Sequence, residues 1–114
     1  MTYQWYIFWA GLNPVKDSEQ AGVRPVLVVS AEHINQALSV VTIIPLTALK
    51  PGRRVYPTEA FLSAEDTGLP KDSLAMDQQV RTIAKSRLGE KGGCLVAEAA
   101  REAVRQALRL YLDL

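Results

Sequence analysis

The sequence has one cysteine, one histidine and a formal net charge of only +1. A single cysteine, Cys94, excludes a disulfide within the chain, and this composition fits a reducing cytoplasm. A single histidine, His33, excludes within one chain the pair of histidines that many nucleases use for acid and base catalysis. Because the net charge is close to zero, no overall basic field indicates a nucleic-acid-binding protein. Such a function would have to depend on a local cluster of cations.

Long apolar runs are also missing from the sequence. The densest runs, residues 5–10 and 26–29, are far too short to span a bilayer, and the N-terminus lacks the positively charged start of a secretory signal. The chain has 114 residues and a hydrophobic content of 48%. We therefore expect one compact globular domain over residues 1–114, soluble and cytoplasmic, with no membrane association.

Short apolar and β-branched runs separated by turn residues predict a mainly β fold. The runs at residues 26–30 and 40–46 are continuous and apolar, as expected for strands that are buried on both faces. The other expected strands are residues 5–12 and segments within 58–62, 73–77 and 78–84. We expect the polar segments 15–23 and 48–56 to be loops, and residues 31–38 to form a single helical turn.

One amphipathic helix is predicted near the C-terminus, after a break at Gly92 and Gly93. Residues 97–112 contain no glycine or proline, and they place Ala100, Val104 and Ala107 at helical spacing. No good N-cap residue precedes this segment, which leaves its start open. Several short strands followed by one helix indicate a small barrel of the α+β class, mainly β, with the helix packed on or beside it.

The residues that remain for catalysis are arginines, hydroxyls and amides at strand ends. We interpret His33, in a polar turn, as a surface residue, and Cys94, which has no obvious base partner, as a small buried residue. The carboxylates lack the spacing of a metal site, and no metal or cofactor is predicted. Arginine suits phosphate, because its guanidinium offers a fixed fork of donors and stays charged at physiological pH. Such groups can stabilise a pentacoordinate phosphorus, and a ribose 2′-hydroxyl nucleophile would confine the reaction to RNA.

Several blocks of the sequence resemble the MazF/PemK family of toxins. Residues 12–30 read LNPVKDSEQAGVRPVLVVS, close to the family pattern L-[ND]-P-x-x-G-S-E-Q-x-G-x-R-P-V-L-V-[VI]-[SQ]. Residues 41–47, VTIIPLT, are similar to the family's next strand and its terminal threonine. Residues 68–73 and 77–83, GLPKDS and DQQVRTI, are similar to the later hairpin, which residues 85–89 continue. The blocks follow the family's order and cover nearly the whole chain.

This resemblance implies an SH3-like barrel, a homodimer and metal-independent cleavage of single-stranded RNA at short sequences. The products would carry a cyclic phosphate and a free 5′-hydroxyl, and a cognate antitoxin of the MazE kind would hold the enzyme inactive. The family's catalytic arginine and threonine fall on Arg24 and Thr47. The positions that border the family's site or contact its RNA are Glu19, Gln20, Ser73, Gln79 and Arg81.

Arg24 is expected to stabilise charge rather than to act as a base. Family accounts give this arginine an acid–base role, yet arginine stays protonated at neutral pH. We therefore expect Arg24 to stabilise the phosphorane and to donate to the leaving oxygen, while the hydroxyl of Thr47 supports the same charge. The group that removes the 2′-hydroxyl proton is left open.

Each of these interpretations has a simpler rival. Without the resemblance, Arg24 would be a strand-entry residue paired with Glu19, and Thr47 an ordinary residue at a strand end. The basic segment 48–56 adds Arg53 and Arg54, which are either RNA contacts or solvated loop charges. A row of arginines on the C-terminal helix is better read as a solvated face. The aromatics within residues 5–9 are better read as core and dimer interface than as platforms for base stacking.

Three departures from the family pattern leave other functions open. Trp5 and Tyr6 replace a glycine–acid pair at the start of the first strand, Asp17 replaces a loop glycine, and Gly11 replaces a common acidic residue. A carboxylate near a phosphate site opposes the anion, so one alternative is a family member that binds antitoxin or RNA without cutting. A gyrase poison of the CcdB kind ranks lower, because its contact uses a C-terminal tryptophan and both tryptophans here are N-terminal.

Overall fold

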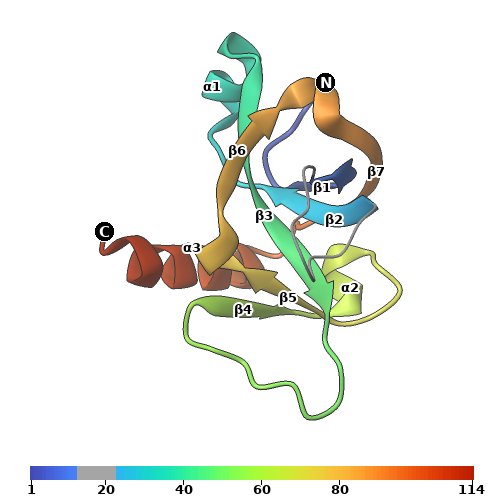
Figure 1. Cartoon of the computed structure of the whole chain (residues 1–114), viewed down its shortest axis with the longest axis vertical. Coiled ribbons are helices and arrows are strands. Elements are labelled where there is room, and N and C mark those ends of the chain that lie inside the picture. Colours follow the sequence, from blue (N-terminus) through green and yellow to red (C-terminus); the bar gives the residue numbers. More distant parts are fainter. Residues whose placement is uncertain (13–22) are drawn as a thin grey trace.

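The fold is a curved antiparallel sheet with one long helix packed against it (Figure 1). The structure is a computed structural model that describes residues 1–12 and 23–114. The strands in these residues are β1 (Tyr6–Gly11), β2 (Val23–Val28), β3 (Val40–Ala48), β4 (Glu59–Leu62), β5 (Ser73–Met76), β6 (Arg81–Ala84) and β7 (Leu88–Cys94). The helices are α1 (Glu32–Ala37), α2 (Ala64–Thr67) and α3 (Glu98–Leu112), and the short 3-10 helices are η1 (Asp77–Gln79) and η2 (Lys85–Arg87).

β3 joins the two parts of the sheet. The strands follow the order β4-β5-β3-β2-β1-β7, and β6 also pairs with β3. One edge of β3 pairs with β2, while the other edge pairs with β6 as far as Ile43 and with β5 from Leu46 onward. Pro45 lies in the gap between these two partners, which suits a residue that has no N–H to donate. β3 therefore runs the length of the fold, as Figure 1 shows in green.

The central strands supply side chains to two separate cores, because successive residues of a strand point to opposite faces. The core beneath α3 contains Ile7, Leu27, Ile44, Leu46, Leu62 and, from the helix, Ala100 and Val104. The second core contains Phe8, Val26, Val28, Val41, Ile43 and Ile83. Burial on both faces explains why β2 and β3 appear in the sequence as continuous apolar runs. None of the helices in the described residues combines the length and the apolar character that crossing a bilayer requires.

The expected fold class is confirmed: a mainly β protein with a C-terminal helix. The strand at 40–46, the short helix within 31–38 and the helix at 97–112 all occur, and the last begins after Ala97 without a side-chain cap. β2 begins at Val23, three residues before the expected start. Of the segment 78–84, only Arg81–Ala84 is a strand, because the preceding residues form η1.

The predicted break at Gly92 and Gly93 is wrong, since both glycines belong to β7. A Cβ atom on Gly93 would overlap the carbonyl oxygen of Thr67 in α2, and one on Gly92 would lie 2.9 Å from Nε1 of Trp9. Glycine is thus required by the close approach of neighbouring segments rather than by a turn. The helix α2 was also not predicted, although Ser63 caps it by accepting a hydrogen bond from the N–H of Asp66 at 3.1 Å.

Trp5 holds a left-handed backbone conformation, with φ of 68°. The resembled family has glycine at this position, and glycine adopts such a conformation without steric cost. Here the N–H of Trp5 donates to Val28 O at 2.8 Å, and its carbonyl accepts from the N–H of Leu95 at 2.7 Å. The ring is buried, and the guanidinium carbons of Arg101 and Arg105 lie 5.4 and 5.1 Å from its centroid. These contacts offset a backbone strain of about 1–2 kcal/mol.

Trp5→Gly is expected to be more stable than Trp5→Ala by about 1 kcal/mol, even though glycine is normally the less stable of the two in a strand or helix. Both variants lose the packing of the indole, so both should be less stable than the wild type by roughly 3 kcal/mol or more. Urea unfolding of the three proteins at one pH measures both differences. A more stable alanine variant would show that the left-handed conformation of Trp5 is not strained.

Candidate active site

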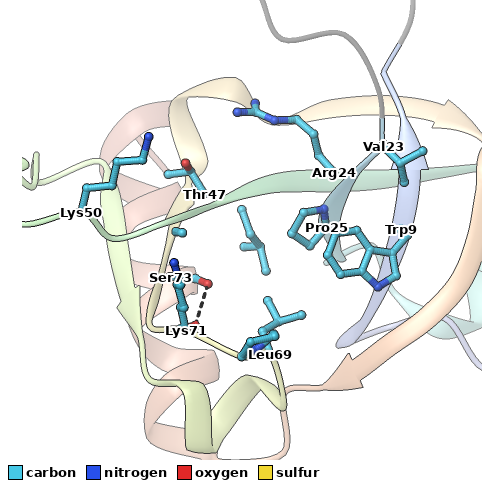
Figure 2. Close-up of a pocket in the computed structure, with 12 residues that line it drawn as sticks. Trp9, Val23, Arg24, Pro25, Thr47, Lys50, Leu69, Lys71 and Ser73 are labelled. Atoms are coloured by element: carbon cyan, nitrogen blue, oxygen red, sulfur yellow. Dashed lines mark hydrogen bonds between the residues drawn. The ribbon is translucent and has the colours of Figure 1, made fainter.

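A pocket lies where the start of β2, the end of β3 and the start of β5 meet (Figure 2). Its walls come from these strands, from β1 and from the segment that leads into β5. The residues that line it are Trp9, Val23, Arg24, Pro25, Leu46, Thr47, Ala48, Lys50, Leu69, Pro70, Lys71 and Ser73. Because strand ends on one side of the sheet converge here, residues far apart in the sequence share one cavity.

Strand register brings Arg24 and Thr47 together. β2 and β3 are antiparallel, with Val26 opposite Pro45. Arg24 and Thr47 each lie two residues beyond this last pair, toward the same end of the two strands. On its other edge Arg24 is paired with Ala10 of β1, and both Arg24 and Thr47 line the pocket. The two residues that the resemblance makes catalytic therefore face the same space.

The pocket combines a cationic side with an apolar one. Among its described lining residues Arg24, Lys50 and Lys71 are cations, and none is a carboxylate. In Figure 2 the side chains of Arg24 and Lys50 extend on one side of the cavity, and Trp9 lies on the other. The remaining lining residues are mostly apolar. Such a site can hold a phosphate against the cations while an apolar group, such as a base, contacts the other wall.

Among the predicted RNA contacts that the structure describes, only Ser73 shares this pocket with Arg24 and Thr47. Ser73 is buried, and its hydroxyl donates to the carbonyl of Lys71 at 3.3 Å. Gln79 and Arg81 are exposed and lie outside the lining, at the end of η1 and the start of β6. The predicted contacts Glu19 and Gln20, like the departure at Asp17, lie outside the described residues.

Comparison with known proteins identifies the family. A family model described as "PemK-like, MazF-like toxin of type II toxin-antitoxin system" matches residues 3–112. The chain belongs to this family of toxin endoribonucleases. Endoribonuclease MazF9 of Mycobacterium tuberculosis is 36% identical over 113 residues, which cover 95% of this chain and 93% of that protein.

Solved structures agree with this membership. The Mycobacterium tuberculosis toxin MazF-mt6 superimposes with a TM-score of 0.77 at 28% identity, over 96% of this chain and 97% of that one. An endoribonuclease from a mycobacterial species, solved in complex with its cognate antitoxin, gives a TM-score of 0.81. The superposition covers 100% of this chain and 97% of that endoribonuclease, and at 23% identity it supports the MazF-like fold alone.

Arg53 of this PemK/MazF-like chain is neither a free loop charge nor a member of the pocket. Its guanidinium donates to both carboxylate oxygens of Glu59 at 2.9 Å, and the side chain of Glu59 is 0% exposed. Glu59 also accepts from the side chain of Gln78 at 2.8 Å and from the N–H of Tyr56 at 3.1 Å. The hydrogen bonds from Arg53 lower the pKa of Glu59 to about 2. Arg54, in contrast, is exposed, with its guanidinium carbon 5.1 Å from the ring centroid of Tyr56.

Of the other polar and aromatic residues, some lie where the sequence predicted and others do not. His33 is exposed, as expected, whereas Cys94 is only half-buried, in β7. Trp5 and Phe8 are in the cores, but Trp9 is half-buried and lines the pocket. In the described part of the chain no group of three or more histidine, cysteine, aspartate or glutamate side chains is placed to hold a metal ion.

The pocket also contains residues that sequence analysis did not single out. Lys50 was noted only as part of a basic loop, and Lys71 lies in a family block without an assigned role. Both lie just outside strand ends, Lys50 after β3 and Lys71 before β5. Their shared location depends on the pairing of those strands, which no local sequence signal contains.

Asp77 is a buried carboxyl at the start of η1. It is fully buried, and neither of its oxygens has a hydrogen-bond partner among the described residues. Burial, with a smaller effect from the negative charge of Glu59, raises the pKa of Asp77 to about 8. The carboxyl is therefore mostly protonated at neutral pH in the folded protein and ionised in the unfolded chain.

Asp77→Asn is expected to stabilise the protein increasingly as the pH rises from 4 to 8. Over this interval unfolding of the wild type releases the proton of Asp77, so its free energy of unfolding falls by up to about 1.4 kcal/mol per pH unit. The amide mimics the protonated acid and does not titrate. Urea unfolding at several pH values measures the difference between variant and wild type. Asp113→Asn at the exposed helix end is the control, and a difference for Asp77→Asn that stays constant with pH would contradict the assignment.

Proposed function

We propose that the chain is a metal-independent, sequence-selective endoribonuclease that cuts single-stranded RNA. In this proposal Arg24 and Thr47 are the catalytic residues, and the cleaved phosphate lies between them. The observation that supports the proposal is that Arg24, near the start of β2, and Thr47, near the end of β3, line one cationic pocket in a chain of the PemK/MazF-like family. Endoribonuclease MazF9, at 36% identity, is named for the same class of reaction.

The reaction uses the ribose 2′-hydroxyl as the nucleophile. Its oxygen loses its proton and attacks the adjacent phosphorus while the bond from phosphorus to the 5′-oxygen breaks. The 5′-oxygen takes up one proton, so the products are a cyclic phosphate and a free 5′-hydroxyl with no net change in protons. The guanidinium of Arg24 stabilises the extra negative charge of the phosphorane and donates to the leaving oxygen, and the hydroxyl of Thr47 donates to the same charge. Both side chains project from residues of paired strands, Arg24 from β2 and Thr47 from β3.

The other residues proposed to contact RNA do not all line the pocket. Ser73 lies in it, whereas Gln79, Arg81 and Arg54 are exposed elsewhere and would reach nucleotides beyond it. Arg53 would contribute through its pair with Glu59, which holds the loop between β3 and β4. Glu19 and Gln20 are proposed on the resemblance alone.

The proposed partners are a second copy of the chain and an antitoxin of the MazE kind. Both follow from family membership, and a mycobacterial endoribonuclease of the same fold has been solved with its cognate antitoxin. Large apolar side chains exposed on α3, such as Leu110 and Leu112, would be covered by such partners. A family member that binds RNA or antitoxin without cutting is the second candidate, and the carboxylate of Asp17 is the feature that favours it.

The wild-type protein in the presence of a chelator is expected to cut a mixed-sequence RNA and to leave its all-deoxy counterpart intact. Arg24→Ala and Thr47→Ala should each lower the rate of cleavage at least about a hundredfold, because each removes a donor to the transition-state charge. Arg109→Ala, on the exposed face of α3, is the matched control and should cut at the wild-type rate. Gel electrophoresis of end-labelled RNA measures all four proteins.

Three results would contradict parts of this proposal. Equal cutting of the deoxy strand, or a strict need for magnesium, would exclude the 2′-hydroxyl mechanism without metal. Full activity of Arg24→Ala would exclude the assigned site even if RNA is cut. RNA binding by the wild type with no cleavage would favour the non-cutting family member.

A further inference from the structure

Lys50 and Lys71 occupy facing positions on the extension of the β3–β5 ladder. The two strands are paired to the last residue of β3. One step further, the N–H of Leu49 donates to the carbonyl of Asp72 at 2.9 Å, so the ladder continues past the strand end. The next step of the same register places Lys50 opposite Lys71.

Lysines at opposite positions of neighbouring strands repel each other, and an anion held between their ammonium groups would relieve this repulsion. Both side chains are exposed, and among the described residues neither ammonium has a hydrogen-bond, ion-pair or aromatic partner. The other described lysines differ. Lys85 donates to two backbone carbonyls, at 2.7 and 2.9 Å, and the amine of Lys91 lies 3.9 Å from the ring centroid of Tyr6.

The pair lies beside the proposed catalytic residues. Both lysines line the same pocket as Arg24 and Thr47. In Figure 2, Thr47 is drawn beside Lys50 and Ser73 beside Lys71, while Trp9 is on the opposite side of the cavity. An anion held by both lysines would therefore be a close neighbour of one held by Arg24 and Thr47, as successive phosphates of one strand are.

We propose that Lys50 and Lys71 together bind one backbone phosphate of the RNA, adjacent to the phosphate that is cleaved. This inference rests on the proposed function, since it assumes that the pocket takes a nucleic-acid strand. A contact to the backbone fixes the position of the strand and adds affinity, and it carries no sequence information directly. Loss of either lysine should thus weaken binding to all sequences alike and should act on KM more than on kcat.

The test measures how the binding of an uncleavable strand depends on salt. The probe is a short mixed-sequence RNA in which every 2′-hydroxyl is methylated, and its Kd is determined by fluorescence anisotropy over a range of KCl concentrations. The proteins are the wild type, Lys50→Gln, Lys71→Gln, the double variant and Lys91→Gln as the matched control. Thermal unfolding by circular dichroism checks that all five are folded.

Each single variant should bind about three to five times more weakly than the wild type. The slope of log K against log salt should become shallower by about 0.7, the value for one phosphate of a single strand. Because both lysines hold the same phosphate, the double variant should bind no more than about twofold more weakly than either single variant. Lys91→Gln should match the wild type in both Kd and slope.

Three outcomes would overturn the inference. The first is wild-type binding that does not depend on salt, and the second is a slope for Lys50→Gln and Lys71→Gln equal to that of Lys91→Gln. The third is a loss of affinity in the double variant that equals the sum of the two single losses. Additive losses would mean that the lysines contact separate phosphates. If wild-type protein cuts RNA but the lysine variants bind normally, this inference fails while the proposed function stands. If the slopes change as expected but no RNA is cut, the phosphate site stands and the proposed cleavage fails.

Discussion

The rest of the structure depends on the pairing of β3 with different strands along its length. Its first four residues pair with β6, its middle residues with β2 and its last three with β5, so one strand sets the positions of three neighbours. The pairing with β2 brings Arg24 to the same pocket as Thr47, and continuing the register with β5 past the strand end places Lys50 opposite Lys71. Both pairs converge on one pocket because β3 ends there. The apolar residues of β3 that face two cores keep this register fixed, since a slip by one residue would exchange the two faces.

The charged residues that stabilise the fold are different from those that line the pocket. Arg53 is bound to the buried carboxylate of Glu59, and this pair, with Gln78 and the N–H of Tyr56, ties the loop after β3 to β4 and η1. Asp77 lies in the same region as a mostly neutral acid, so it adds little negative charge beside Glu59 at neutral pH. The pocket, by contrast, has cations and no carboxylate among its described lining residues. A chain with a net charge of +1 thereby presents a locally basic site.

Local signals in the sequence were enough to predict the elements whose stability is local or that are buried on both faces. These include β2, β3 and α3, which appear as apolar runs and helical spacing. β7 was missed because Gly93 is needed for close contact with Thr67, a reason that only the folded chain reveals. The same holds for the pair of Arg53 with Glu59 and for Lys71. Arg24 and Thr47 were predicted from resemblance to a family, and only the folded chain shows that they line one pocket. Their catalytic roles stay predictions.

The chemistry assigned to Arg24 and Thr47 requires that the 2′-hydroxyl be the nucleophile, and the ends of the cut RNA record this directly. The most direct measurement is mass spectrometry of the fragments released from one RNA oligonucleotide by the wild-type protein in chelator, sampled at early times. The account predicts a 2′,3′-cyclic phosphate on the upstream fragment and a 5′-hydroxyl on the downstream fragment. A 5′-phosphate on the downstream fragment would show that water attacks the phosphorus and that the bond from phosphorus to the 3′-oxygen breaks. That result would contradict the account.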